Sequence, residues 1–347
     1  MKIKNNKIIN NYFKKCFTNI NNDDEINSFI DLEFSLEQEP IIQKKLHQLG
    51  FFEYYSDDSN LWPSLYYDID QYLNTPYHQN ISLASIKAND YELSQEIIPA
   101  NKLINLSFLK DDPEKALNDT FILKAYNKPY NCVVLKQNDL LWMTDTPQEA
   151  NTIDPYAQKA FGNVLNFGLG IGYFVYMACL NPKVKTITII EYSKEVIDLF
   201  NKYLLPQFPQ NKKITIIQGD AFHYFNQSFV EQFDYTFVDI YKSNEDGLIT
   251  IAKMLDQYLP QYQQIDFWIE STCVELVRAM MLEFFYELMT NKFNNYDDPI
   301  LNTIFLKMQG YFNEIPAVIT TASELQEFLY NPMIIREILA YQLPKNV

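Results

Sequence analysis

One stretch decides the fold of this chain: Asn163-Val164-Leu165-Asn166-Phe167-Gly168-Leu169-Gly170-Ile171-Gly172-Tyr173-Phe174. The chain has only eight glycines in 347 residues, and three of them lie here. Glycine permits positive φ and lets a ligand approach the main chain without a Cβ in the way. The apolar flanks predict a strand before the glycines and a helix after them. A strand, a glycine turn and a helix N-terminus together favour nucleotide binding, because unpaired N–H groups face the ligand.

Downstream of this turn, apolar runs alternate with helical segments. Pro182 and Pro206 follow the ends of two predicted helices, and Ser193 stands where it can cap the second of them. Connections of this length join parallel strands, and largely apolar strands are typical of a sheet that helices cover on both faces. The sequence therefore predicts an α/β fold with a Rossmann-like parallel sheet, whose strands span 164–167, 187–190, 214–217, 235–238 and 265–269.

Acidic residues stand where three of these strands end. Glu191 ends the second predicted strand, Asp220 follows the third, and Asp239 ends the fourth. The carboxyl ends of parallel strands line one crevice, where ligands bind. There Glu191 could accept hydrogen bonds from ribose hydroxyls, Asp220 could accept one from an adenine amino group, and Asp239 could face a cationic centre. Each also has a structural alternative: a solvated strand-end charge for Glu191, a turn residue for Asp220 and a helix cap for Asp239.

The glycine spacing distinguishes between classes of cofactor. A dinucleotide-binding turn reads G-x-G-x-x-G, whereas this chain has G-x-G-x-G followed by Tyr173. Together with Glu191 and Gly219-Asp220-Ala221-Phe222, this spacing resembles the class I S-adenosylmethionine-dependent methyltransferases over about residues 160–271. The resemblance implies that the residues binding S-adenosylmethionine, or a related adenosyl sulfonium, are Gly168, Gly170, Gly172, Glu191, Asp220 and Ala221.

A narrower resemblance is to the spermidine synthase branch of this superfamily. It rests on Glu191-Tyr192-Ser193-Lys194-Glu195-Val196-Ile197, on Tyr203-Leu204-Leu205-Pro206, and on a predicted β-meander directly before the nucleotide domain. Two features depart from that branch. Ile171 stands where the glycine turn usually has an acidic residue, and Asp239-Ile240-Tyr241-Lys242 replaces the usual Asp-Ser-x-Asp-Pro. The second carboxylate, which would help to bind and deprotonate a polyamine, is therefore missing.

These observations leave three functions open. The leading hypothesis is a methyltransferase acting on a small-molecule acceptor, because a sulfonium methyl is already electrophilic and the protein mainly has to hold the acceptor in line. Asp239 is the first candidate catalytic residue, and Tyr241 and His223 are second-rank candidates. Asp145 and Glu149, just before the domain, could reach over the cofactor. The alternatives are a spermidine-synthase-like aminopropyltransferase and a catalytically silent protein that binds an adenosyl ligand.

Four segments are predicted along the chain: a mostly helical region at 1–115, a β-meander with a connecting helix at 116–160, the Rossmann-like domain at 161–272 and a helical cap at 273–347. The strands of the meander are expected at 121–126, 132–136 and 140–144. The helices of the cap are expected at 274–292, 300–312 and 323–339, and Thr321 with Glu324 forms a capping-box signature for the last. The sheet is expected to stop after five strands, with 317–320 as the only further candidate.

The composition of the chain argues against several classes of binding partner. The net charge is −16, whereas nucleic-acid binding draws on clustered Lys and Arg. The Asp-Pro-Pro-Tyr and Pro-Cys motifs of nucleic-acid methylation do not occur in the sequence. Four separated cysteines and three scattered histidines show no metal-ligand spacing, and no apolar run reaches membrane-spanning length. We therefore expect a cytoplasmic protein without metal, nucleic acid or membrane partners, and the family resemblance is compatible with a homodimer.

Overall fold

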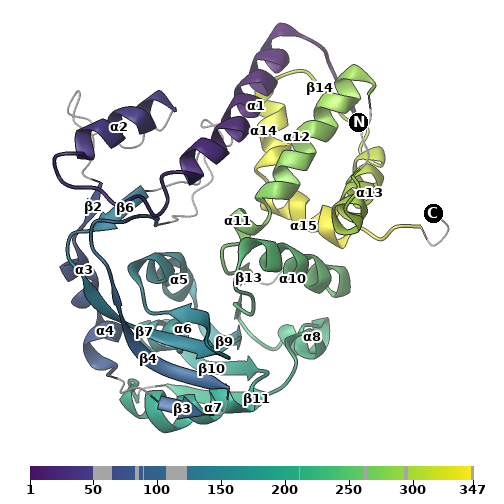
Figure 1. The fold of residues 1–347 in the computed structure, drawn as a ribbon. Helices are drawn as coiled ribbons and strands as arrows, with labels where there is room; N and C mark the ends of the chain where they lie inside the picture. The colour runs from purple at the N-terminus through teal and green to yellow at the C-terminus, as the bar shows by residue number, and fades with distance from the viewer. Residues whose placement is uncertain are drawn as a thin grey trace.

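The computed structural model describes residues 1–49, 65–82, 86–88, 90–106, 123–210, 212–261, 264–292 and 296–344. Its largest sheet has five parallel strands in the order β11-β10-β9-β12-β13 (Figure 1). These strands are β9 (Gly162–Phe167), β10 (Val184–Glu191), β11 (Lys213–Gln218), β12 (Tyr235–Val238) and β13 (Gln264–Phe267). All five predicted strands are present, and the predicted Rossmann-like fold is confirmed.

Successive residues of the central strand, β9, belong to two different hydrophobic cores. Val164 packs in one core with α6 (Tyr173–Leu180) and α7 (Lys194–Leu199), whereas Leu165 packs in the other with α10 (Asn244–Gln257). The alternation follows from the two-residue period of a strand and explains why these strands are apolar throughout. The chain builds one half of the sheet outward from β9 and then starts the other half at β12. The strand order therefore reverses between β9 and β12, which is the ligand-binding position in sheets of this kind.

A second sheet is antiparallel and has the order β3-β4-β7-β8. Its strands are β3 (Ile86–Ala88), β4 (Tyr91–Ile98), β7 (Tyr130–Gln137) and β8 (Leu140–Thr144). The β7–β8 hairpin matches two of the predicted meander strands, but the third neighbour is β4 and not the strand predicted at 121–126. The mostly helical region expected at 1–115 is thus wrong for residues 86–105. β4 is stabilised by pairing with β7, which lies more than thirty residues further along the chain. The residues of β4 and their neighbours in the sequence do not indicate this pairing.

The strand predicted at 121–126 belongs to a third sheet. Its described part, β6 (Leu123–Tyr126), pairs antiparallel with β5 (Leu103–Asn105) and parallel with β2 (Tyr66–Tyr67). Residues 121 and 122, and the predicted boundary between 115 and 116, lie outside the described residues. The helices of this part are α2 (Glu39–Gln48), α3 (Ile69–Leu73) and α4 (Pro76–Asn80).

The C-terminal segment is helical, as predicted, and it packs on the N-terminal helix α1 (Lys7–Asn27) (Figure 1). Its helices are α11 (Glu270–Cys273), α12 (Glu275–Thr290), α13 (Pro299–Asn313), α14 (Ala322–Leu329) and α15 (Pro332–Ala340). The predicted capping box of Thr321 and Glu324 is present. The single helix expected at 323–339 is wrong, because Asn331 caps a new helix that begins at Pro332, where the ring has no N–H to continue the old one.

The remaining strand candidate does form a strand, but not in the parallel sheet. β14 (Val318–Ile319) pairs in parallel with β1 (Lys2–Ile3), which ties the N-terminus to the C-terminal segment. The parallel sheet therefore has five strands in the described part of the chain, as expected.

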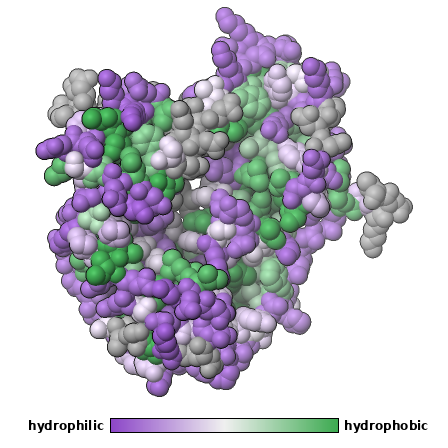
Figure 2. Space-filling model, in the orientation of Figure 1, coloured by the Kyte–Doolittle hydropathy of each residue, from purple (hydrophilic) through white to green (hydrophobic). Residues whose placement is uncertain are grey.

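None of the described helices is both long enough and apolar enough to cross a bilayer. On the face seen in Figure 2, hydrophobic residues form separate patches among hydrophilic ones.

Candidate active site

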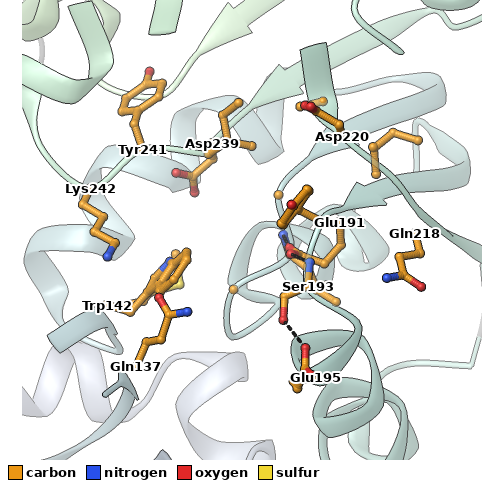
Figure 3. A pocket seen from close by; sticks show the side chains of 18 of the residues that line it. Gln137, Trp142, Glu191, Ser193, Glu195, Gln218, Asp220, Asp239, Tyr241 and Lys242 are labelled. Atoms are coloured by element: carbon orange, nitrogen blue, oxygen red, sulfur yellow. Dashed lines mark hydrogen bonds between the residues drawn. The ribbon is translucent and has the colours of Figure 1, made fainter. Parts of the chain in front are cut away.

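The carboxyl ends of the parallel strands border a cavity of about 1090 Å³ (Figure 3). Its walls include the turns that follow β9, β10, β11 and β12, where ligands bind in open parallel sheets. The antiparallel sheet supplies a further wall, through Tyr91 on β4 and Trp142 and Met143 on β8. The structure brings most of the expected site residues together here: Gly168, Gly170, Glu191, Asp220, Ala221, Asp239 and Tyr241.

The glycine turn has the left-handed backbone that the sequence predicts. Gly168 has φ +92° and Gly170 has φ +51°, and both border the cavity. A Cβ at Gly168 would overlap the carbonyl oxygen of Asp239, so this glycine allows the end of β9 to approach the end of β12. A Cβ at Gly170 would overlap the sulfur of Met143, so the second glycine lets the turn approach β8.

Gly172 does not border the cavity, which corrects its expected role in ligand binding. It stands at the N-cap of α6 with φ +74°, and a Cβ there would overlap the ring of Phe200. Its role is therefore to turn the chain into α6 against a buried aromatic ring. The sequence shows that a glycine is needed here, but it does not show whether a ligand or a side chain occupies the space.

Glu191 links the glycine turn to the end of β10. Its Oε2 accepts a hydrogen bond from the N–H of Leu169 at 2.9 Å, and its Oε1 accepts one from the N–H of Ser193 at 2.7 Å. Burial raises the pKa of Glu191, and the N–H donors oppose that increase. The alternative of a freely solvated charge is therefore wrong. Each oxygen can accept a second hydrogen bond, so Glu191 can still bind a hydroxyl group in the cavity.

Asp220 combines the two roles that the sequence left open. Its Oδ1 accepts a hydrogen bond at 2.9 Å from the N–H of Phe222 and so caps the short helix α8 (Ala221–Tyr224). The same side chain is exposed and lies on the cavity wall beside Ala221. A helix cap and a ligand contact are compatible here, because a carboxylate has two oxygens.

Asp239 and Glu149 bring two carboxyl groups to one cavity. Asp239 is half-buried, and burial together with the nearby charge of Glu149 raises its pKa to about 8. Glu149 lies in the first turn of α5 (Pro147–Lys159), where it accepts hydrogen bonds from the N–H and the hydroxyl of Thr144 at 3.1 and 2.9 Å. Burial raises the pKa of Glu149 to about 7. Both groups therefore titrate near neutral pH, which is typical of acid–base sites.

The structure also decides whether Asp239 caps a helix, and it places the other candidates, Asp145 and His223. Ser243, and not Asp239, caps α10. Asp145 is buried and does not border the cavity; the hydroxyl of Tyr72 donates to it, and His78 Nδ1 lies 3.3 Å from its Oδ2. His223 is exposed and does not border the cavity. Of Asp145, Glu149 and His223, only Glu149 joins Asp239 in the cavity.

Tyr241 borders the cavity, but its hydroxyl does not face it. The hydroxyl donates to the carbonyl oxygen of Trp268, and Figure 3 shows it pointing away from the carboxyl group of Asp239. Burial, together with neighbouring acidic groups, raises the pKa of Tyr241 well above its ordinary value. The expected catalytic role of this hydroxyl is therefore corrected: Tyr241 is a wall residue that fixes the main chain at Trp268.

Several cavity residues were not expected from the sequence. Tyr91, Trp142 and Met143 come from the antiparallel sheet, and Lys242 follows β12. The ammonium of Lys242 lies 4.1 Å from the centre of the Trp142 ring. Trp142 is most simply interpreted from sequence as a core aromatic residue, because nothing in its neighbours reports that β8 lies across the carboxyl ends of the parallel strands.

The chain is similar to several solved structures, and these similarities identify no family for it. No family model and no curated protein matches the sequence. A solved structure described as a SAM-dependent methyltransferase from Streptococcus mutans is 17% identical, over 42% of this chain and 43% of that chain, with a TM-score of 0.26. The chain thus spans less than half the length of that protein.

Two further solved structures come from the spermidine synthase branch. Spermidine synthase from Thermotoga maritima is 13% identical, over 51% of this chain and 68% of that one, with a TM-score of 0.27. A protein described as a probable spermidine synthase from Corynebacterium glutamicum is 10% identical, over 72% and 94%, with a TM-score of 0.33. With TM-scores this low, none of the three similarities bears on what this chain does.

Proposed function

We propose that this chain is an S-adenosylmethionine-dependent methyltransferase acting on a small-molecule acceptor. One observation carries the proposal: a single cavity at the reversal of strand order brings together the glycine turn, Glu191, Asp220 and Asp239. Each of these positions was expected from the strand ends alone. Their meeting around a cavity of about 1090 Å³ leaves room for both a nucleoside and an acceptor.

The residues present fit an adenosyl sulfonium. Glu191 would bind the ribose hydroxyls and Asp220 the adenine amino group. The main chain at Gly168 and Gly170, which carries no Cβ, would let the ligand approach closely. The carboxyl groups of Asp239 and Glu149 favour a positive charge between them. When bound, the cofactor would supply an electrophilic methyl group on a positively charged sulfur.

Asp239 would serve the acceptor side of the reaction. Its pKa of about 8 means that a fraction of the molecules carry the carboxylate at neutral pH, and this fraction grows with pH. A carboxylate in this position can accept the proton that an amine or hydroxyl acceptor loses on methylation. Trp142 and Met143 would exclude water from the same end of the cavity and help to hold the acceptor in line.

Aminopropyl transfer is the second candidate. The antiparallel sheet that borders the cavity favours it, because that sheet immediately precedes the nucleotide domain, as in the resembled branch. The residues after β12 oppose it, because Lys242 lies where a polycationic amine would need carboxylates. A silent adenosyl-binding protein is the third candidate.

Calorimetry with four ligands tests the proposal: S-adenosylmethionine, S-adenosylhomocysteine, decarboxylated S-adenosylmethionine and methylthioadenosine. We expect the first two to bind more tightly than the last two. Preference for the last two would favour aminopropyl transfer, and binding of none would refute an adenosyl site. A panel of small amines, phenols and carboxylates, assayed for S-adenosylhomocysteine release, then separates an enzyme from a silent binding protein.

The variant Asp239→Asn tests the catalytic assignment. Loss of the base should lower turnover by roughly 100-fold or more, while S-adenosylhomocysteine affinity changes much less. Asp246→Asn is the control, because Asp246 is exposed in the first turn of α10 and does not border the cavity. An equal loss of turnover and of S-adenosylhomocysteine affinity would contradict the assigned role of Asp239.

A further inference from the structure

One end of the cavity carries a cation that the proposed function does not use. Figure 3 shows Lys242 and Trp142 on one side of Asp239, with Glu191, Asp220 and Gln218 on the other. The ammonium of Lys242 lies 4.1 Å from the centre of the Trp142 ring, within the range of a cation–π interaction. This contact joins the turn after β12 to strand β8, so two separate segments fix the position of the ammonium.

The charge of Lys242 stands out against the rest of the cavity wall. Six carboxylic residues border the cavity: Asp90, Glu149, Glu191, Glu195, Asp220 and Asp239. The other bordering cation, Lys194, is paired with Asp198 on its own helix. In the part of the chain that the structure describes, no carboxylate forms an ion pair with Lys242.

The contact with Trp142 leaves hydrogen-bonding capacity on the ammonium. A lysine ammonium has three N–H donors, and an aromatic face is a weaker partner than an anion. Lys242 is exposed, so it remains accessible to a ligand in the cavity. Charge-assisted hydrogen bonds from an ammonium to a carboxylate are about twice as strong as neutral ones.

We propose that Lys242, held on the face of Trp142, forms a carboxylate-binding subsite at the end of the cavity opposite Glu191 and Asp220. The proposal rests on the proposed function for its orientation, because a nucleoside bound at Glu191 and Asp220 would direct its other end toward Asp239 and Lys242. The carboxylate has two possible sources: the amino-acid arm of S-adenosylmethionine, or the acceptor. Either source makes Lys242 a specificity-determining residue.

The test compares ligands that differ only in a carboxylate. S-adenosylmethionine and its decarboxylated form supply the donor pair. Benzoate and benzamide, measured on the protein saturated with S-adenosylhomocysteine, supply the acceptor pair and suit an aromatic wall. Each pair is measured by calorimetry on the wild type, on Lys242→Met, which keeps an unbranched side chain of similar length, and on Lys242→Arg, which keeps the charge. Lys253→Met is the control, because Lys253 is exposed on α10 outside the cavity.

We expect Lys242→Met to weaken binding of one carboxylate ligand about tenfold, as for loss of a charged hydrogen bond, and to spare its uncharged counterpart. Loss for S-adenosylmethionine alone identifies the donor as the source, and loss for benzoate alone identifies the acceptor. Lys242→Arg should retain most of the affinity, and Lys253→Met should match the wild type.

Two results would overturn the proposal. One is an unchanged affinity of Lys242→Met for both carboxylate ligands. The other is an equal change within each pair, which would mean that Lys242 only offsets the surrounding negative charge. If the wild type binds no adenosyl ligand, the proposed function fails, and the benzoate and benzamide pair on the free protein still decides whether Lys242 binds a carboxylate.

Discussion

At the scale of single residues, three neighbouring carboxyl groups have raised pKa values. Burial raises the pKa of Asp145 and Glu149 to about 7 and that of Asp239 to about 8, and the charge of Glu149 adds to the increase at both aspartates. Because the charge of Glu149 affects both aspartates, the protonation of the three groups is linked. The cavity therefore changes charge within the range in which most enzymes work.

The first prediction concerns stability and pH. Folding raises the pKa of Glu149 from its ordinary 4.5 to about 7, so the folded state holds a proton that the unfolded state releases above pH 4.5. Its contribution to stability is complete below the unfolded pKa and is lost as pH rises through the folded pKa. Between pH 5 and pH 8 the free energy of unfolding of the wild type should therefore fall by about 2 kcal/mol more than that of Glu149→Gln.

Urea denaturation at several pH values measures this difference. Glu231→Gln is the matched control, because Glu231 is exposed on the surface and lies outside the cavity. It should show the same pH dependence as the wild type. Parallel curves for Glu149→Gln and the wild type would contradict a buried, proton-holding carboxyl group at this position.

The second prediction follows from the same carboxyl groups and concerns ligand binding. A positively charged sulfur near Asp239 would lower the pKa of that carboxyl, so S-adenosylmethionine should release protons on binding near pH 7 and bind more tightly at pH 8 than at pH 6. S-adenosylhomocysteine is a neutral thioether and should release fewer. Calorimetry in buffers of different ionisation enthalpy counts the protons. Equal release with both ligands, or no effect of Asp239→Asn, would argue against this placement of the charge.

At the scale of elements, the turn between β9 and α6 contains glycines of two kinds: Gly172 packs against a side chain, whereas Gly168 and Gly170 border the cavity. Our third prediction is that Gly172→Ala lowers the free energy of unfolding by roughly 1–3 kcal/mol, because it combines positive φ with overlap against Phe200. The folded fraction should keep nearly normal ligand affinity, since Gly172 does not border the cavity.

Gly170→Ala provides the comparison within the same turn. Its Cβ would overlap the sulfur of Met143, at the flexible end of a side chain on the cavity wall, so we expect it to affect ligand affinity more than Gly172→Ala does. Combining Gly170→Ala with Met143→Ala should restore part of the loss. Denaturation and ligand titration of the three variants are sufficient, and the reverse ranking of Gly170 and Gly172 would refute the distinction.

At the scale of the whole molecule, the C-terminal helices are tied to the edge of the parallel sheet. Arg336 on α15 forms a bidentate ion pair with Glu270 on α11 and donates to the carbonyl oxygen of Ile265 on β13 at 2.9 Å. Both side chains are largely buried, with 11% and 16% of their surface exposed. Our fourth prediction is that Arg336→Ala lowers the free energy of unfolding by about 3 kcal/mol, because it leaves a buried carboxylate without its partner.

The control for this prediction is an exposed ion pair. Lys128 and Asp70 form one with 47% and 53% of their side-chain surface exposed, and Lys128→Ala should cost less than about 1 kcal/mol. The double variant Arg336→Met with Glu270→Gln should cost less than Arg336→Ala, since no charge remains buried. Similar losses for Arg336→Ala and Lys128→Ala in urea denaturation would show that the buried pair does not join the two parts.

The sequence by itself determined the half of this protein that contains the parallel sheet. Apolar runs separated by helix signals specified five parallel strands, and the residues directly after them specified the glycine turn, Glu191, Asp220 and Asp239. This succeeded because periodicity, caps and turns depend on neighbours in the chain, and because parallel strands necessarily bring their carboxyl ends to one edge.

Only the tertiary structure decided the opposite wall of the cavity and the direction of its side chains. Strand β4 exists because it pairs with β7, and Trp142 borders the cavity because β8 lies against the glycine turn, where Met143 meets Gly170. Tyr241 faces away from Asp239 because its hydroxyl donates a hydrogen bond to the carbonyl oxygen of Trp268. These outcomes depend on contacts between segments far apart in the chain, and one-dimensional patterns do not encode them.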